Sequence, residues 1–226
     1  IGDISELNDK FKELSKRKET ICKTISELGK MTDELQKRIG TCWNATELED
    51  IYLPYKPKRR TKAQIAREQG LEPLAMTIML QREKQPEMVA QRFVCGEVKN
   101  VETAIKGAQD IIAEMISEDE RARQQLRNAF KREAIITAKV VKTKKDTDKA
   151  AKYSDYFDFS EPLKTCSGNR LLAMRRAENE GVLRVNIHVD DNEAIKRLQR
   201  QFVNGQSACQ KLVEYAAEDS YKRLLE

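Results

Sequence analysis

This sequence predicts a mainly α fold with one minor β element, and three observations support that class. Charged residues make up 35% and aromatic residues only 6% of the 226 residues, which is typical of helical proteins with solvated outer faces. Apolar residues recur at three- and four-residue spacing through most of the chain, whereas a single segment alternates strictly between apolar and polar residues. Glycine and proline are scarce, at nine and five. We therefore expect a scaffold of several helices, including helical hairpins.

The chain opens with a helix predicted over residues 4–28, where the apolar residues fall on one helix face. Gly29 supplies the left-handed residue that commonly ends a helix, and Thr32 is a suitable cap for the next one. The second helix can return along the first through Leu35 and Ile39. These features predict a helical hairpin, with a short coiled-coil seam as the alternative.

A basic connector, YLPYKPKRRT, follows a short helix predicted over residues 46–51. Its two prolines end that helix and stiffen the segment after it. Thr61 and Gln64 then form a capping box that begins another helix, which ends at Gly70. A repressor-type helix-turn-helix over residues 65–78 is disfavoured, because its second helix lacks suitable base-reading side chains.

The remaining helices follow from the same periodicity. Ser117 to Glu120 form a second capping box, which predicts a helix running to about Thr137. Other helices are predicted over residues 71–81, 86–93, 101–116, 169–180, 191–203 and 207–226.

The β element is the segment VLRVNIHV, residues 182–189, which alternates between an apolar and a polar face. A lone strand leaves its backbone groups unpaired, so it requires a partner. Residues 136–142 are one candidate, and a strand outside this sequence is the other. Residues 142–169 are polar and predicted to be irregular. We therefore divide the chain into a helical region, residues 1–140, and residues 141–226, which hold the irregular segment, a helix, the strand and the C-terminal helices.

Catalytic and metal chemistry find little support in these residues. The five cysteines are widely spaced, form no CxxC pair and indicate reduced thiols in the cytoplasm. A single histidine, His188, leaves no Cys/His or Ser/His arrangement, and no Gly-rich phosphate loop, HExxH or GxSxG motif occurs. Asp155, Asp158 and Glu161 are close in sequence, but acidic residues in loops usually form turns and caps. We expect no enzyme, cofactor or metal site, and no segment reaches the length of a membrane span.

Nucleic-acid binding is the function that the charge pattern favours. The formal net charge is +5, and the cations are clustered. The connector and the start of the next helix could hold phosphates, since helix N-termini attract anions. The alternative is a structural corner, in which the arginines pair with carboxylates. The primary candidates are Lys56, Lys58, Arg59, Arg60, Lys62 and Arg67. Secondary candidates are Lys142, Lys144, Lys145, Arg170, Arg175 and Arg176.

Two long segments resemble the Tex family of bacterial transcription accessory proteins: LEDIYLPYKPKRRTKAQIAREQGLEPLA and AAKYSDYFDFSEPLKTCSGNRLLAMRRAENEGVLRV. Their order and separation also match, so the resemblance covers essentially the whole chain. It implies an elongated, largely helical, multi-domain protein with a ribonuclease-H-like domain, helix-hairpin-helix modules and an RNA-binding OB-fold domain. This chain resembles the helical N-terminal region only. It departs from the family at residues 166–169, where the family's Ser-His-Arg pattern loses its histidine, although Arg170 is kept.

The resemblance implies a non-catalytic helical scaffold within a factor that binds RNA or DNA, mostly through domains absent from this chain, in transcription or RNA metabolism. The connector is then either an auxiliary phosphate contact or a brace within the scaffold. The alternative function is a docking module for RNA polymerase or an elongation partner. Salt dependence separates the two, because phosphate binding releases condensed counterions and a packed apolar interface does not.

Overall fold

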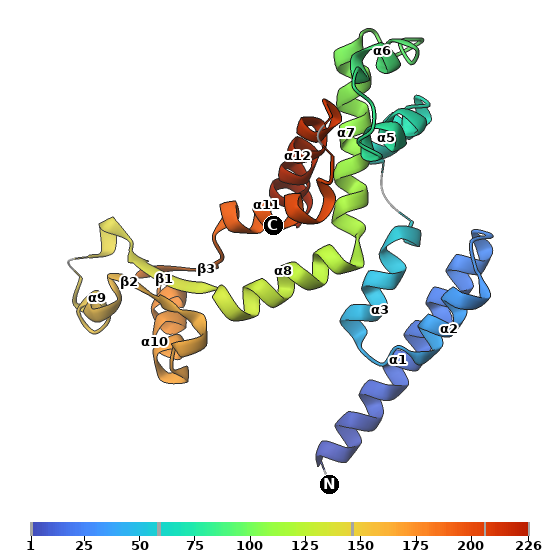
Figure 1. The fold of residues 1–226 in the computed structure, drawn as a ribbon. Coiled ribbons are helices and arrows are strands. Elements are labelled where there is room, and N and C mark those ends of the chain that lie inside the picture. The colour runs from blue at the N-terminus through green and yellow to red at the C-terminus, as the bar shows by residue number, and fades with distance from the viewer. Residues whose placement is uncertain (1, 58–59, 146, 206, 226) are drawn as a thin grey trace. The chain divides into compact units, whose positions relative to one another are not determined.

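The computed structural model describes residues 2–57, 60–145, 147–205 and 207–225, and the fold is mainly α as predicted (Figure 1). These residues form two compact units, which we describe separately. The first consists of residues 1–123 together with 201–226, and the second of residues 124–200. The division predicted after residue 140 rests on sequence texture and stays a prediction.

The first unit begins with the predicted hairpin of α1 (Gly2–Glu27) and α2 (Asp33–Thr41), followed by α3 (Ala45–Tyr52). Gly29 lies at φ 66°, and the Thr32 hydroxyl accepts a hydrogen bond from the backbone N–H of Leu35, as the sequence predicted. The Asn44 side chain caps α3. The three helices enclose a small core of Ile21, Ile25, Leu35, Ile39, Leu48, Ile51 and Tyr52.

The rest of the first unit is built around one long helix, α7 (Val101–Glu118). The helices that pack on it are α4 (Lys62–Glu68), α5 (Glu72–Met79), α6 (Pro86–Gln91) and α12 (Cys209–Ser220). Helix α12 continues directly into a final helical turn, Tyr221–Leu225. Figure 1 shows α7 between α5 and α12. A Cβ atom on Gly107 would lie 2.4 Å from Leu71 Cδ1 and 3.3 Å from Ala66 Cβ, so a larger residue there would require the Leu71 side chain to move.

Gln81 ties the loop after α5 to the loop before α12, within the same unit. It is buried at φ 54°, and its side-chain amide donates to the Phe202 carbonyl and accepts from the backbone N–H groups of Asn204 and Gly205. A Cβ on Gly205 would come within 2.8 Å of the Gln81 backbone oxygen. Two chain segments far apart in sequence are joined here by a polar side chain.

The capping box predicted at Ser117 is wrong. Ser117 is buried in the last turn of α7, and its hydroxyl donates to the Glu114 carbonyl. Asp119 instead caps α8 (Glu120–Glu133) by accepting from the backbone N–H of Ala122. An acidic side chain can take the capping role as well as a hydroxyl, and the two alternatives lie two residues apart. Helix α8 also ends before the predicted Thr137, because a strand begins at residue 135.

The second unit holds a three-stranded antiparallel sheet in the order β2-β1-β3. Strand β3 (Leu183–His188) is the predicted strand, and its partner β1 (Ile135–Val140) falls in the predicted candidate segment. Strand β2 (Asp158–Pro162) lies in the segment predicted to be irregular, so that prediction is wrong at these residues. Asp, Ser and Pro disfavour strands, and an edge position tolerates them because one side of the strand stays unpaired.

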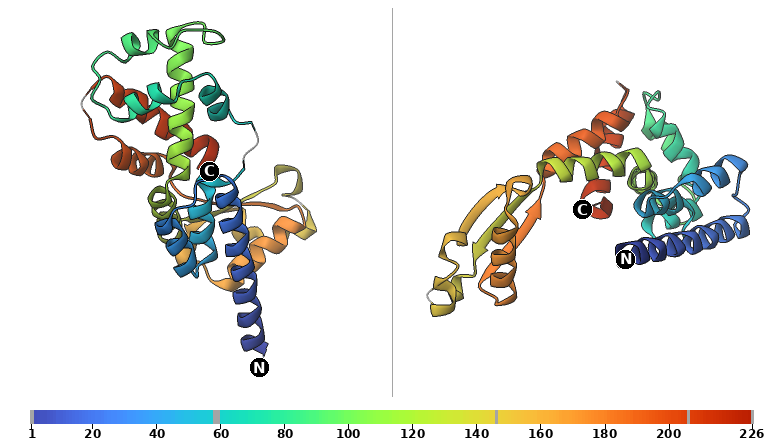
Figure 2. Two further views of the ribbon diagram at one scale, coloured as in Figure 1. Left: turned by 90° about the vertical axis from the view of Figure 1, so that its right-hand side faces the viewer. Right: turned by 90° about the horizontal axis from the view of Figure 1, so that it is seen from below.

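One face of this sheet is covered by α10 (Gly168–Asn179), which runs along the strands (Figure 2, right). The covered face contributes Ile136, Ala138 and Val185, which pack with Met174 and Ala177 of α10. The other described α-helices are α9 (Asp148–Ala151), which is short, and α11 (Asp191–Phe202), and 3₁₀ turns lie at Lys142–Lys144, Ser154–Tyr156 and Leu163–Thr165. Across the described residues, none of the helices is both long enough and apolar enough to cross a membrane.

Candidate nucleic-acid interface

The connector starts as a tightened continuation of α3. Leu53–Tyr55 form one 3₁₀ turn with Pro54 in it, and Tyr52 is buried in the α1–α3 core. The Arg17 guanidinium lies 5.3 Å from the centre of the Tyr52 ring, and Tyr55 packs against the same core. The buried tyrosine therefore pins the connector to the helices before it and is not available to stack on a base.

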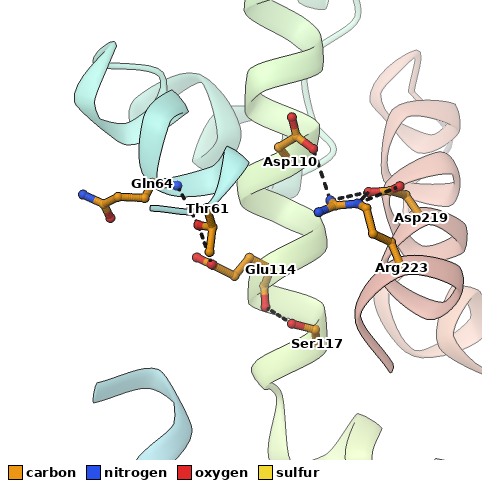
Figure 3. Close-up of polar contacts among 7 residues, drawn as sticks. All are labelled: Thr61, Gln64, Asp110, Glu114, Ser117, Asp219 and Arg223. Carbon is orange, nitrogen blue, oxygen red and sulfur yellow. Dashed lines mark hydrogen bonds and ion pairs between the residues drawn. The ribbon is translucent and has the colours of Figure 1, made fainter. Parts of the chain in front are cut away.

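Thr61 fixes the other end of the connector. Its hydroxyl oxygen accepts from the backbone N–H of Gln64 at 3.0 Å, which is the predicted cap of α4. The same hydroxyl donates to Glu114 Oε1 at 3.1 Å, as Figure 3 shows. Helix α4 has only seven residues, so its dipole is small and adds little to anion binding. Thr61 holds the start of α4 against α7.

Arg67 is turned towards the same carboxylate. Its Nη1 donates to Glu114 Oε2, and its Nε lies 3.7 Å from Glu72 Oε1. The Glu114 side chain is only 7% exposed, and that of Arg67 is 26% exposed. A carboxylate this deeply buried needs charged and hydrogen-bonding partners. Arg67 therefore supplies the counter-charge for an acid within the scaffold.

A second acid on α7 anchors the C-terminal turn. The Arg223 guanidinium donates to Asp110 Oδ1 at 3.1 Å and to Asp219 Oδ2 at 2.6 Å (Figure 3). Burial raises the pKa of Asp110, and the charge of Arg223 acts against that rise. The hydrogen bond from Arg223 to Asp219 raises the pKa of this arginine.

Sequence reasoning missed Asp110 and Glu114, although a signal was present. They lie four residues apart, so both acids fall on one side of α7. The residues next to them in the sequence are mostly apolar. Figure 3 shows their side chains turned to opposite neighbours, Asp110 towards Arg223 and Glu114 towards Thr61. Acids at this spacing on a buried helix predict basic partners on the helices packed against it.

The lysines of the connector differ from Arg67. Lys56 and Lys62 are exposed, and neither forms a side-chain hydrogen bond or ion pair within the described part of the chain. Arg60 pairs with Glu68 at 3.1 Å, but that pair is exposed and contributes little to stability. A hollow of about 340 Å³ between α4 and α7 is bordered by Lys62, Lys106 and Glu102. Lys58 and Arg59 lie outside the described residues.

The secondary candidates are divided between two sides of the second unit. Lys142, Lys144 and Lys145 are exposed in the segment after β1. The other three lie on α10, which covers the opposite face of the sheet. Two of these are paired, Arg170 with Glu161 at 2.9 Å and Arg175 with Glu178 at 2.6 Å, and Arg176 is exposed.

The acidic segment near β2 has a structural role in the described residues. Glu161, one of the acids close in sequence there, is the partner of Arg170. In the portion of the chain that the structure describes, no three His, Cys, Asp or Glu side chains come together as a metal site requires.

Comparison with known proteins identifies the family. A family model described as Tex central region-like matches residues 81–222. Transcriptional accessory protein Tex of Neisseria gonorrhoeae is 41% identical over 82% of this chain and 24% of its own length. The protein YdcI of Bacillus subtilis, named as uncharacterized, is 36% identical over 100% of this chain and 32% of its own. S1 RNA-binding domain-containing protein 1 of Homo sapiens is 27% identical over 100% of this chain and 24% of its own.

This chain therefore spans about a quarter of the length of the curated relatives that it matches. The resemblance placed it in the helical N-terminal region of the family, and the matching model describes residues 81–222 as central. The model covers well over half of the residues, and identity to the Neisseria protein extends over most of the chain. The chain belongs to the Tex family.

Proposed function

We propose that this chain is a non-catalytic helical scaffold within a cytoplasmic factor that binds nucleic acid and acts in transcription or RNA metabolism. Two relatives support the direction of this proposal by their names, one a transcriptional accessory protein and the other an S1 RNA-binding domain protein. In this proposal, RNA or DNA is bound mostly by parts of the whole protein outside this chain. RNA polymerase or an elongation factor is a further proposed partner.

The observation that supports the proposal is that some polar residues near α7 are held by a buried acid whereas nearby lysines stay exposed. Buried Glu114 holds Arg67 and Thr61, so the connector has a fixed attachment at its end. Lys56, within the connector, and Lys62, directly after it, stay exposed. A stiff basic segment loses less entropy on binding than a flexible one.

The proposed contacts are charge-assisted hydrogen bonds to phosphate oxygens, which position a nucleic acid without reading its sequence. Lys56, Lys58, Arg59, Arg60 and Lys62 make these contacts, and Arg67 acts as the brace that positions them.

The second candidate function is a protein-docking module without direct nucleic-acid contact. It is favoured by exposed apolar side chains on the first unit, among them Trp43, Phe11 and Leu7. The Trp43 and Phe11 rings meet edge to face with centroids 5.5 Å apart. An exposed aromatic pair of this kind fits a protein partner better than a phosphate backbone.

Fluorescence anisotropy with labelled single-stranded RNA and duplex DNA tests the choice, at about 50 mM and about 200 mM salt. The informative variant changes Lys58, Arg59 and Arg60 together to Ala. The matched control changes Lys10, Lys12 and Lys16 to Ala, which removes the same charge from exposed positions of α1. Circular dichroism checks that both variants fold.

Salt-dependent binding that the connector variant loses and the α1 control keeps would support phosphate contact by the connector. Equal binding by the wild type and the connector variant would refute that contact. If none of the three proteins binds either polymer at low salt, the docking module becomes the better account.

A further inference from the structure

The sheet of the second unit has one covered face and one open face. Strand β1 directs Ile136 and Ala138 to the core under α10, so Thr137 and Lys139 lie on the other side. Strand β3 likewise buries Leu183 and Val185 and exposes Arg184, Asn186 and His188. On β1 and β3 the open face is polar apart from Ile135, which is exposed at the end of β1 opposite His188.

The register places two cations opposite each other on this open face. Lys139 is the direct partner of Arg184 across the β1–β3 pair, and Thr137 is the partner of Asn186. Like charges directly opposite each other on a sheet are destabilising. Asp158 is the partner of Lys139 on the β2 side. Nevertheless, among the described residues neither Lys139 nor Arg184 forms a side-chain hydrogen bond or ion pair.

A hollow of about 790 Å³ lies over this face. Thr137, Lys139, Arg184, Asn186 and His188 border it, and Lys142 joins them from the segment after β1. Three cations therefore surround one concave surface that also offers hydroxyl, amide and imidazole groups. Other charged side chains of the unit are paired, as in Arg170–Glu161 and Lys152–Glu180. On the open face Asp158 is the register partner of Lys139, but among the described residues no ion pair joins it to Lys139 or Arg184.

We infer that the open face of the β2-β1-β3 sheet is a binding surface for a single-stranded polynucleotide. Lys139, Lys142 and Arg184 hold phosphates. The negative charge of the bound strand offsets the repulsion between Lys139 and Arg184. Thr137 and Asn186 can hydrogen-bond sugar or base edges. The flat groups of Arg184 and His188 can stack on bases.

The dimensions of the surface favour one strand over a duplex. Neighbouring strands lie about 4.8 Å apart, so a three-stranded sheet spans roughly 10 Å, which suits a single backbone. This inference rests on the proposed nucleic-acid role for its ligand, but it uses residues from a different unit than the connector. The two can therefore succeed or fail independently.

The test measures anisotropy of labelled single strands of about twelve nucleotides, one RNA and one DNA, with the 226-residue chain. The test variant combines Lys139→Gln with Arg184→Gln. The matched control combines Lys164→Gln with Arg200→Gln, which removes the same charge from exposed positions of the turn before α10 and of α11. Thermal unfolding followed by circular dichroism reports on folding of both.

The sheet variant should bind roughly ten-fold more weakly at low salt, and its log–log salt slope should fall by about 1.4, the value for two lost phosphate contacts on a single strand. The control should keep the wild-type slope. Crosslinking with thiouridine-substituted RNA should label peptides covering residues 135–145 and 183–188. Tighter binding of the RNA than of the DNA in the anisotropy measurement would identify RNA as the preferred strand, and equal binding would indicate backbone recognition alone.

Three outcomes would overturn the inference. The first is wild-type binding by a folded sheet variant, and the second is an equal loss in the control, which indicates general electrostatic attraction. The third is absence of binding to either strand by the wild type, which would leave an acidic protein surface as the better partner. Loss of binding by the sheet variant alone, with the connector variant unaffected, would reject the connector contact and retain the sheet surface.

Discussion

The connector after α3 and the open face of the β2-β1-β3 sheet are both basic, but their cations are held in different ways. In the first unit Arg67 lies against Glu114, a carboxylate that is only 7% exposed. In the second unit Lys139 and Arg184 are neighbours across two strands, and neither forms an ion pair with a described carboxylate, although Asp158 is the register partner of Lys139.

The difference separates two uses of positive charge. A cation that meets a buried acid belongs to the stability of the fold, because removing it strands the acid in a poorly solvating environment. Two cations held directly opposite each other, without an ion pair to an acid, cost stability. Such an arrangement is expected where a ligand later supplies the missing charge, since functional sites commonly sacrifice stability. The same residue types thus have opposite expected effects when they are replaced.

The largest expected effect is at Arg67. Arg67→Ala should lower the free energy of unfolding by about 3 kcal/mol, because buried Glu114 would lose its charged hydrogen bond from Arg67. Urea unfolding measured by circular dichroism gives this value. Glu72→Gln is the control, since Glu72 is 60% exposed and lies 3.7 Å from Arg67, and its change should stay within about 0.5 kcal/mol. A small loss for Arg67→Ala would mean that Arg67 does not brace α4 against α7.

A smaller effect of opposite sign is expected on the sheet. Arg184→Thr should leave stability unchanged or raise it by roughly 0.5 kcal/mol, because it removes the repulsion with Lys139 and introduces a residue that favours strands. Asn186→Thr, on the same face of β3, measures the strand preference without a change of charge. Thermal unfolding compares the two. If Arg184→Thr destabilises the fold by more than about 1 kcal/mol, the contrast between the two regions fails.

The smallest effect concerns Asp110, and it depends on pH. Burial raises the pKa of Asp110 in the folded state, so the contribution of this carboxyl to stability is complete below its unfolded pKa and is lost as pH rises through the folded pKa. Asp110→Asn removes that dependence. At pH 7 the free energy of unfolding of the variant should equal that of the wild type or exceed it by up to about 0.5 kcal/mol. Towards about pH 3.5 the wild type should become more stable relative to the variant. Urea unfolding at both pH values measures this difference. If the wild type instead became more stable relative to the variant as pH rises, the pKa of Asp110 would be lowered by folding and not raised.

The sequence alone determined the local elements of this protein. Periodicity predicted the α1–α2 hairpin and α7, and alternation predicted β3, because these patterns follow directly from the geometry of one helix or one strand. Turn and cap chemistry also succeeded at Gly29 and Thr61. It failed at Ser117, because Asp119, two residues later, is the cap of α8. It also failed at β2, whose residues form a strand only because β1 lies beside them.

Tertiary structure decided the meaning of the charges. Arg67 and Arg59 read alike in the sequence, and nothing local indicates that Glu114, 47 residues away, is the partner of Arg67. In the same way Lys139 and Arg184 lie on separate strands, and only the pairing register places them side by side. Electrostatic interactions depend on distance in space and on burial, and neither is fixed by position along the chain. The sequence therefore supplied the helices, the strand and the family resemblance, whereas packing determined which cations brace the scaffold and which remain exposed.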